Sequence, residues 1–306
     1  MDKLVTVFTP LYNRKHLLPR LYASLAEQTN CSFEWIICDD HSEDGSFELA
    51  QEYAQAESRF PIRVTRTARN GGKHRAINIG AAMARGMLFF IVDSDDLLTP
   101  DAIERIFAWE ETIRKDPAFA GLGFLRADLS MKPLGTTFPE QSCDCTSLER
   151  DAHQITGDKA EVFYTAVIRQ YPFPEFEGET FLGEGVVWDR IARDGLKLRW
   201  INEIIYLCEY QSGGLTDTWE KNLARNPMGH ALLLKQKMDF TPCVGYERFL
   251  AVYGYYYTVN LERKCSMKYA CGQLDYPLWK AYCYMPIRKG HRICGRLRAL
   301  LGSGKT

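Results

Sequence analysis

The sequence lacks the features of several large classes of protein. No apolar run approaches the roughly 20 residues that a membrane-spanning helix needs, and the chain opens directly on a predicted strand without a signal-peptide pattern. Its 306 residues carry a net charge of −1, so no overall positive charge indicates nucleic acid as a partner. These absences favour a cytoplasmic protein.

Cysteine is plentiful, but its spacing lacks the patterns of metal and redox sites. None of the ten cysteines forms a CxxC pair. Cys143 and Cys145, which flank Asp144, are the most closely spaced, and without a histidine beside them they are a weak metal signal. We expect reduced and mostly buried thiols, as is usual in the cytoplasm.

Glycine-rich phosphate-binding loops are also missing. No GxGxxG follows the first predicted strand, which argues against a dinucleotide site. The motif GxxxxGK[ST] is absent as well, which argues against a P-loop nucleotidase. An Asp-x-Asp strand end also occurs in aspartate-nucleophile phosphatases, where it typically ends the first strand. Here the first strand ends in Thr9 and Pro10, without a carboxylate.

What the sequence does contain is a repeated alternation of strand, polar loop and helix in residues 1–116. Strands are predicted at residues 4–9, 33–38, 62–66 and 87–92. The last is apolar throughout, as is typical of a strand covered on both faces. The alternation predicts an α/β fold, with a mostly parallel Rossmann-like sheet flanked by helices.

The second half of the chain has a different pattern. Strands are predicted at residues 122–129, 162–168 and 203–209, and a helix is predicted to begin at Gly183. From Trp219 onward the pattern is helical. With 46% hydrophobic residues, the chain can build one large domain, or one domain with an appendage.

Each of the four strands in the first half ends in a polar loop. These loops cover residues 12–14, 39–40, 70–73 and 93–96. Parallel strands present their carboxyl ends at one edge of a sheet, where ligands bind, so we expect one site there. In the last loop Asp93, Asp95 and Asp96 repel one another unless a cation joins them. Mg2+ or Mn2+ carrying a substrate diphosphate is the usual ligand of such a cluster.

The order of four short motifs resembles the family-2 glycosyltransferases of the GT-A fold. The motifs are TPxYNR at residues 9–14, DDxS from residue 39 with Gly45-Ser46, NGG from residue 70 with Asn78, and DSDD at residues 93–96. The resemblance covers residues 1–217. It implies an inverting, metal-dependent hexosyltransferase of the type that builds bacterial surface polysaccharides. Its donor would be a nucleotide-diphosphate sugar, with a UDP-sugar favoured, and its acceptor a glycan or lipid-linked saccharide.

The resemblance implies a role for each loop in binding the donor. Tyr12 would lie against the base, and Asp40 would accept the ring N–H of uracil or thymine, with Asp39 structural. Asp93 or Asp95 would hold the ribose, while Asp95 or Asp96 would bind the Mn2+ or Mg2+ that bridges the diphosphate. Lys73 would contact the base or a phosphate, and a solvated loop lysine explains it equally well. The remaining residues of the implied nucleotide site are Thr9, Pro10, Asn13, Arg14, Asn70, Gly71 and Ser94.

A catalytic base is implied in the second half, where the acceptor would bind. Relatives carry a Glu-Asp pair at the start of a helix there, and this sequence has Glu184 followed by Gly185. Glu184 is therefore the implied base, and the helix N-terminus favours its charged form. A plain helix-capping role is the alternative. Asp189 and Asp158 are weaker candidates.

The resemblance divides the chain into functional regions. Residues 1–217 would be the catalytic domain, with the nucleotide sugar bound by residues 1–116 and the acceptor by residues 117–217. Within it, the segment 210–216 contains two adjacent glycines and is expected to close over the diphosphate. Residues 218–306 would form a helical, basic extension.

The end of the chain is basic although the whole is not. Residues 262–306 contain ten lysines and arginines against two acids. Within them, positions 293, 297, 300 and 301 are apolar on one helical face, and positions 288, 289, 292 and 296 are basic on the other. With aromatic residues from Tyr253 onward, this pattern is typical of a peripheral anchor on the inner face of a membrane. Docking on the catalytic domain or on a second copy of the chain, as a homo-oligomer, is the alternative.

Two other functions are weighed against this one. Sugar-1-phosphate nucleotidyltransferases also use an α/β sheet with metal-binding aspartates, but they usually open with a glycine-rich loop. Residues 9–14 contain no glycine. A catalytically inactive membrane-associated scaffold would have no reason to keep three mutually repelling carboxylates.

Overall fold

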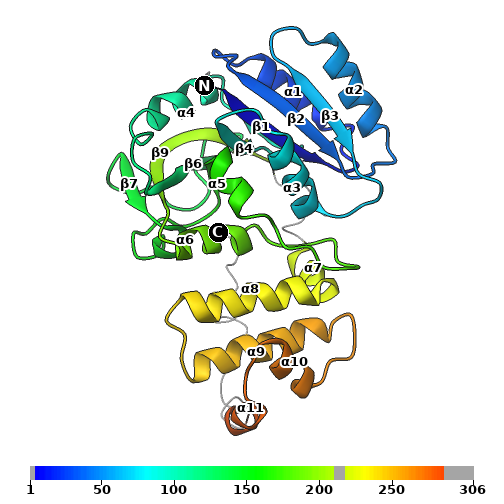
Figure 1. Ribbon diagram of the computed structural model, residues 1–306, viewed down its shortest axis with the longest axis vertical. Coiled ribbons are helices and arrows are strands. Elements are labelled where there is room, and N and C mark those ends of the chain that lie inside the picture. The colour runs from blue at the N-terminus through cyan, green and yellow to red at the C-terminus, as the bar shows by residue number, and fades with distance from the viewer. Residues whose placement is uncertain (1–3, 210–217, 286–306) are drawn as a thin grey trace. The chain divides into compact units, whose positions relative to one another are not determined.

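The computed structural model describes residues 4–209 and 218–285, and the chain divides into two compact units (Figure 1). The first, called the sheet unit below, comprises Met1–Pro174 and Arg190–Gln211. The second, called the helical unit, comprises Glu175–Asp189 and Ser212–Thr306. The segment 175–189 therefore leaves the sheet unit, which the chain rejoins afterwards.

A mixed sheet with strand order β3-β2-β1-β4-β8-β6-β9-β5 is the framework of the sheet unit, and β7 also pairs with β9. Its strands are β1 (Val5–Leu11), β2 (Phe33–Asp39), β3 (Ile62–Arg66), β4 (Leu88–Ile91), β5 (Leu97–Leu98), β6 (Phe119–Asp128), β7 (Ser142–Cys145), β8 (Lys159–Tyr164) and β9 (Lys197–Cys208). Neighbours among β1–β4 run parallel, as predicted. Strand β8 is antiparallel to both β4 and β6. The carboxyl ends of β1–β4 thus meet at one edge.

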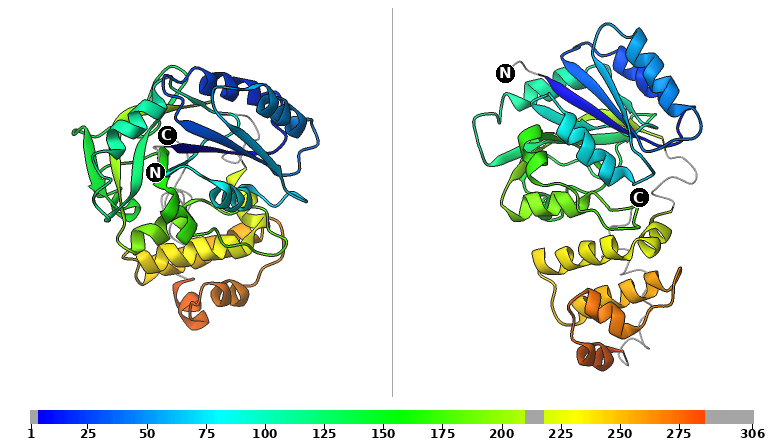
Figure 2. Two further views of the ribbon diagram at one scale, coloured as in Figure 1. Left: turned by 45° about the horizontal axis from the view of Figure 1, so that its top comes forward. Right: turned by 45° about the vertical axis from the view of Figure 1, so that its right-hand side comes forward.

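Helices cover both faces of the four parallel strands (Figure 2). The helices of this unit are α1 (Leu18–Ala26), α2 (Ser46–Ala56), α3 (Lys73–Met83), α4 (Ala102–Glu110) and α5 (Thr165–Gln170). Val7, Trp35 and Phe90 share a buried cluster with residues of α1, α2 and α4. Phe8 points to the opposite face, where it stacks on Phe89 at 5.4 Å and closely approaches α3. Because successive strand residues point to opposite faces, both faces are apolar and the strands read as continuous hydrophobic runs.

Two predicted strands differ from those observed by more than three residues at one end. The strand predicted at residues 162–168 ends at Tyr164 and continues as α5. Its apolar residues Phe163 and Ile168 are buried in either conformation, so the pattern could not separate strand from helix. Strand β9 begins at Lys197 rather than at residue 203. The start of β9 contains charged residues, which do not form an apolar strand pattern. One of them, Arg199, forms an ion pair at 2.6 Å with Asp144 on β7, a partner that is distant in sequence.

Five helices make up most of the described part of the helical unit. They are α7 (Trp219–Arg225), α8 (Pro227–Phe240), α9 (Tyr246–Val259), α10 (Met267–Gln273) and α11 (Leu278–Tyr284). Phe249 and Tyr255 of α9 are fully buried in its core. No helix in residues 4–209 or 218–285 is both long and apolar enough to cross a membrane.

The predictions for the end of the chain fall partly outside the described residues. The expected lid over residues 210–216 and the basic amphipathic helix over residues 288–301 lie outside the described residues. Of the aromatic residues upstream, Tyr253 and Tyr255 belong to the core of the helical unit. Trp279 and Tyr282 of α11 are exposed.

Candidate functional site

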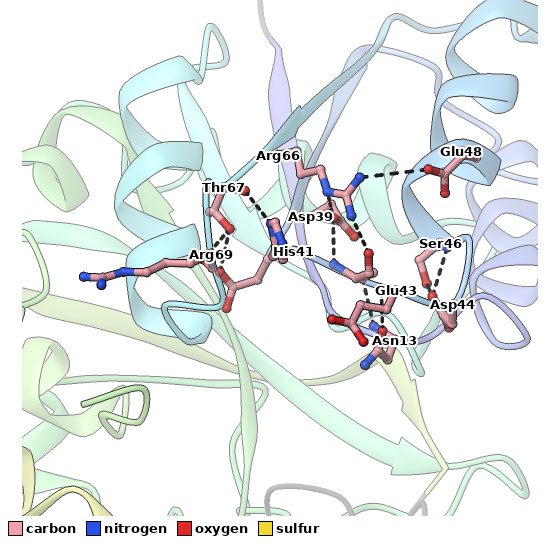
Figure 3. A network of polar contacts seen from close by, with 12 residues as sticks. Asn13, Asp39, His41, Glu43, Asp44, Ser46, Glu48, Arg66, Thr67 and Arg69 are labelled. Carbon is pink, nitrogen blue, oxygen red and sulfur yellow. Dashed lines mark hydrogen bonds and ion pairs between the residues drawn. The ribbon is translucent and has the colours of Figure 1, made fainter. Parts of the chain in front are cut away.

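The loops after β1 and β2 are joined by hydrogen bonds (Figure 3). The backbone N–H of Asn13 donates to Oγ of Ser42 at 2.9 Å, and Oδ1 of Asn13 accepts the N–H of Glu43 at 2.9 Å. The φ of Asn13 is 52°, a left-handed conformation that asparagine tolerates. These contacts position the adjacent Tyr12, whose side chain is 45% exposed and offers an aromatic face at the edge of the sheet.

The loops after β2 and β3 are joined by the buried carboxylate of Asp40. It accepts the N–H of Gly71 at 2.9 Å, the N–H of Gly72 at 2.6 Å and the hydroxyl of Thr67 at 2.9 Å. Gly72 has a φ of 91°, which an L side chain would strain, so the NGG turn requires glycine there. Both oxygens of Asp40 are thus engaged by the chain itself, and its contact with a nucleobase stays a prediction.

Asp39, the neighbour of Asp40, is completely buried. Its Oδ1 accepts the N–H of Ser42 at 3.0 Å and forms an ion pair with Nε of Arg66 at 3.2 Å. Figure 3 shows Arg66 lying between Asp39 and Glu48. Among the described residues, Oδ2 of Asp39 has no hydrogen-bond partner. Asp39 therefore supports the loop, as the structural role expected of it requires.

The loop after β4 is joined to the third and first loops by ion pairs. Nζ of Lys73, the first residue of α3, lies 2.6 Å from Oδ1 of Asp93. Nε of Arg14 lies 4.0 Å from Oδ2 of Asp95. The four polar loops therefore converge as the strand pattern predicted, each linked to the next in a closed ring.

Four other residues of the implied nucleotide site lie in or beside these loops. Thr9 is completely buried in β1, where its hydroxyl accepts the indole N–H of Trp35 at 2.9 Å. Pro10 and Asn70 are half-buried, and Ser94 is buried. The side chain of Thr9 therefore serves the core of the sheet.

The pKa values of the three carboxylates of the last loop are shifted in different directions. Burial opposes ionisation of Asp93, but the positive charges of Lys73 and Arg126 outweigh it and lower the pKa of Asp93. Burial and the charge of Asp93 raise the pKa of Asp95, with Arg14 acting against them. Asp93 is thus the stable anion of the group.

Tyr206 and Arg126 complete the cluster, and the sequence predictions missed both. The hydroxyl of Tyr206 donates to Oδ2 of Asp96 at 2.8 Å and accepts the N–H of Asp93 at 2.9 Å. The Arg126 guanidinium lies 4.3 Å from the centre of the Tyr206 ring, since the two residues are in register on β6 and β9. A lone arginine in an otherwise apolar strand was the available signal.

Asp96 is the third carboxylate of the loop, and its pKa is raised strongly. Burial and then the charge of Asp93 raise the pKa of Asp96 to about 7. Negative charge on Asp95 and Asp96 is therefore costly until a cation offsets it. Their donor atoms are all carboxylate oxygens, which suit hard divalent cations such as Mg2+ and Mn2+. The residues present fit such an ion.

The implied base, Glu184, belongs to the helical unit. Its carbonyl accepts the N–H of Val187 at 2.9 Å and of Trp188 at 3.2 Å, so it directly precedes α6 (Gly185–Arg193), as predicted. Asp189 lies on that helix, and Asp158 is exposed in the sheet unit. The residues implied for donor binding and for catalysis therefore belong to different units.

The segment that carries Glu184 is held on the helical unit by two side chains. The buried carboxylate of Glu179 accepts the N–H of Met228 at 2.7 Å and of Gly229 at 2.8 Å, at the N-terminus of α8. In return, Oδ1 of Asn226 accepts the N–H of Thr180 at 2.7 Å, and that of the next residue at 3.1 Å. Charge-assisted bonds of this kind are among the stronger hydrogen bonds.

Comparison with known sequences places this geometry in context. The family model described as glycosyl transferase family 2 matches residues 6–123. The chain is 24% identical, over 85% of its length, to glycosyltransferase GlyA of Streptococcus pneumoniae, and the match covers 38% of that protein. It is 34% identical over 41% of its length to the uncharacterized glycosyltransferase EpsJ of Bacillus subtilis, covering 35% of it. The matches thus span little more than a third of these relatives.

Solved structures show a similar fold. S. aureus TarS, residues 1–349 in complex with UDP, aligns with a TM-score of 0.58 and 16% identity over 94% of this chain and 92% of that one. Mannosyltransferase PcManGT from Pyrobaculum calidifontis, in complex with GDP-Man and Mn2+, aligns with a TM-score of 0.53 and 16% identity over 96% of this chain and 78% of that one. At such identities the likeness shows the fold alone, and it confirms the predicted GT-A class.

Proposed function

We propose that the protein transfers a sugar from a nucleotide-diphosphate donor to a saccharide acceptor, because residues 6–123 match the family model described as glycosyl transferase family 2, the family that the four motifs resemble. The observation that carries this proposal is the closed ring of four loops around Asp93, Asp95 and Asp96. The ring combines an exposed aromatic face with carboxylates suited to a divalent cation, and a sugar nucleotide needs both. A UDP-sugar is the favoured donor, and the TarS structures with UDP and UDP-GlcNAc support this choice.

In this proposal the loop residues divide the donor between them. Tyr12 lies against the base, with Asn13, Arg14, Asn70 and Gly71 around it. Asp40 holds the turn that contains Gly71 and Gly72. It would accept the ring N–H of the base if one of these donors moved away from its carboxylate. Asp93, paired with Lys73, lies on the ribose side, next to Ser94.

Asp95 and Asp96 would hold Mn2+ or Mg2+. A divalent cation bound there supplies positive charge that offsets the negative charge growing on the departing diphosphate. Asp95 is the better placed direct ligand, since its side chain is 25% exposed whereas Asp96 is buried and bonded to Tyr206. Tyr206 then orients Asp96, and Lys73 holds Asp93 in its charged form.

Glu184 is the proposed base. It would remove the proton from an acceptor hydroxyl, whose oxygen attacks the anomeric carbon on the face opposite the nucleotide. The new bond forms as the bond to the diphosphate breaks, so the configuration of the sugar inverts.

The acceptor is proposed to be lipid-linked, with the basic region after Met285 holding the protein on the membrane. Truncation after Met285 keeps α11, whose Tyr284 packs on Phe249 at 5.7 Å, and so leaves the core of the helical unit intact. The truncated protein should no longer sediment with anionic liposomes, while the full chain should sediment in a salt-sensitive manner. Retained sedimentation would contradict the anchor.

Calorimetric titration with UDP, dTDP, GDP and CDP, each with and without Mn2+, tests the proposed function directly. Tight and Mn2+-dependent binding of a uridine or thymidine diphosphate is the expected result. Absence of binding by all four nucleotides would overturn the assignment of this edge as a donor site.

A further inference from the structure

A second cluster of metal-ligand type lies in the sheet unit, away from the four loops in the sequence. One ligand atom each from Cys143, Cys145 and His153 lies within 4.8 Å of the other two. The expectation that no histidine accompanies the two cysteines is therefore wrong. His153 is eight residues beyond Cys145, and the chain turns back between them.

The two cysteines are held by the pairing of β7 with β9. Cys143 pairs with Trp200 and Cys145 with Leu198, and the indole N–H of Trp200 donates to the carbonyl of Cys145 at 3.0 Å. Alternate residues of a strand point to the same face, so both thiols lie together. The intervening Asp144 points away and pairs with Arg199.

His153 is positioned by the turns that follow β7. The short helix η1 (Ser147–Glu149) is closed by a capping box in which the Glu149 carboxylate accepts both the N–H and the hydroxyl of Thr146, each at 2.9 Å. The N–H of His153 then donates to the carbonyls of Glu149 and Arg150. Strand and turn therefore fix the backbone of all three residues.

We propose that Cys143, Cys145 and His153 bind Zn2+. Two thiolates and an imidazole are the donor set that zinc prefers, with the fourth tetrahedral position left to water. Zn–S bonds of about 2.3 Å and Zn–N bonds of about 2.0 Å place such ligand atoms roughly 3.5–3.8 Å apart. The observed cluster needs to contract by about 1.3 Å at most, and His153 is exposed, so that core packing does not oppose a turn of its imidazole.

A disulfide between the two cysteines is the competing use of these thiols. Residues two apart in an extended strand have Cα atoms about 6.6 Å apart, close to the upper limit for a disulfide. Such a bond would strain β7 where it pairs with β9. Both cysteines are free thiols in the structure.

Bound zinc would connect β7 to the turn that carries His153. It would stabilise the long connection between β6 and β8, since metal binding to the folded chain adds to its stability. All three ligands belong to the sheet unit, and zinc binding there does not depend on the proposed transferase activity.

Metal analysis of the full-length protein, purified under reducing conditions without chelator, tests the proposal. We expect stoichiometric zinc by elemental mass spectrometry. Exchange for Co2+ should give the absorption of a tetrahedral ion, with a thiolate charge-transfer band. Cys143→Ser and His153→Asn should each lower zinc affinity about 10–100-fold, with matched controls Cys31→Ser and His16→Asn unchanged.

Three outcomes would overturn the zinc site. One is a wild-type protein that takes up neither zinc nor Co2+ when either metal is added alone. Another is a zinc content that Cys143→Ser and His153→Asn leave unchanged. The third is a Cys143–Cys145 disulfide found by mass spectrometry in the reduced preparation. His153 is exposed, so His153→Asn decides the question even if a cysteine variant fails to fold.

Discussion

The sheet unit holds two clusters that suit metals, and they differ in donor atoms and in how the chain assembles them. Asp93, Asp95 and Asp96 offer oxygen and come from one loop after β4. Cys143, Cys145 and His153 offer sulfur and nitrogen and come from a strand and a later turn. Hard oxygen ligands favour Mg2+ or Mn2+, whereas thiolates and imidazole favour Zn2+. One unit can therefore hold an exchangeable metal and a structural metal without competition.

Both clusters hold protons where a cation would bind. Burial and the charge of Asp93 raise the pKa of Asp96 to about 7. Burial raises the pKa of Cys145 to about 12. Either metal must displace protons, so each should bind more tightly as the pH rises. The clusters also differ in what holds their ligands in place. Tyr206 and Lys73 bind the carboxylates, whereas the thiols are placed by the pairing of β7 with β9 and by the indole of Trp200, which donates to the carbonyl of Cys145.

The largest expected effect separates binding from chemistry. Glu184→Gln should reduce turnover of the donor about 10²–10⁴-fold, because the amide cannot take a proton. UDP binding and zinc content should stay as in the wild type. Turnover is measured as release of the nucleoside diphosphate, and binding by calorimetry. Glu177→Gln, an exposed residue of the same segment, is the matched control; near-normal turnover of Glu184→Gln would place the base elsewhere.

Asp95→Asn should affect one metal and spare the other. We expect Mn2+-dependent UDP affinity to fall about 100-fold, since a charged ligand is lost, with zinc content unchanged. Asp101→Asn, which alters an exposed carboxylate paired with Arg105 at 2.9 Å, should bind UDP normally. Cys143→Ser should show the converse pattern. A variant that lost both metals together would show that the clusters are not independent.

The raised pKa of Asp96 predicts how binding depends on pH. Below about 7, Mn2+-dependent UDP affinity should fall about tenfold per pH unit, because the cation competes with one proton. The stability of the metal-free protein should depend on pH in the opposite direction. Between its ordinary pKa of 3.8 and about 7, Asp96 is protonated when folded and ionised when unfolded, so stability falls as the pH rises.

Asp96→Asn is the control for both profiles. It should remove the pH dependence of stability that comes from this group, and the steep part of the binding profile. The protonation of UDP itself changes with pH in the same way in both experiments, so the difference between the two profiles isolates Asp96. Profiles that coincide for the variant and the wild type would rule out Asp96 as the titrating group.

Tyr206→Phe should have the smallest effect of the four. It removes a hydroxyl that bonds both Asp96 and the N–H of Asp93, so we expect about tenfold weaker Mn2+-dependent UDP binding. The free energy of unfolding should fall by about 1–3 kcal/mol, measured by urea denaturation, because the buried carboxylate of Asp96 loses a hydrogen-bond donor and the N–H of Asp93 loses its acceptor. Tyr164→Phe, whose hydroxyl bonds Glu110 at 3.3 Å, is the control for loss of a tyrosine hydroxyl elsewhere in the sheet unit.

What could be predicted from the sequence follows from how local each feature is. The loops after β1–β4 were foreseen because an apolar strand that ends in polar residues is a local pattern, and parallel strands bring such ends together. Tyr206 and Arg126 were not foreseen, because the register of β6 against β9 is set by distant parts of the chain. His153 was missed for a different reason: it follows Cys145 by eight residues, outside the usual spacing of zinc ligands, and only the turns between them bring it back to the two cysteines.

The hydrogen bonds that join Glu179 to the start of α8, and Asn226 to Thr180, have a consequence for protein engineering. The loop with Glu184 is interleaved in sequence with the sheet unit but hydrogen-bonded to the helical one. A chimera that transplants residues 218–285 from a relative would replace Asn226 and the start of α8, and so would leave Glu179 and the N–H of Thr180 without their hydrogen-bond partners. Residues 175–189 have to be exchanged together with that block, as one discontinuous module.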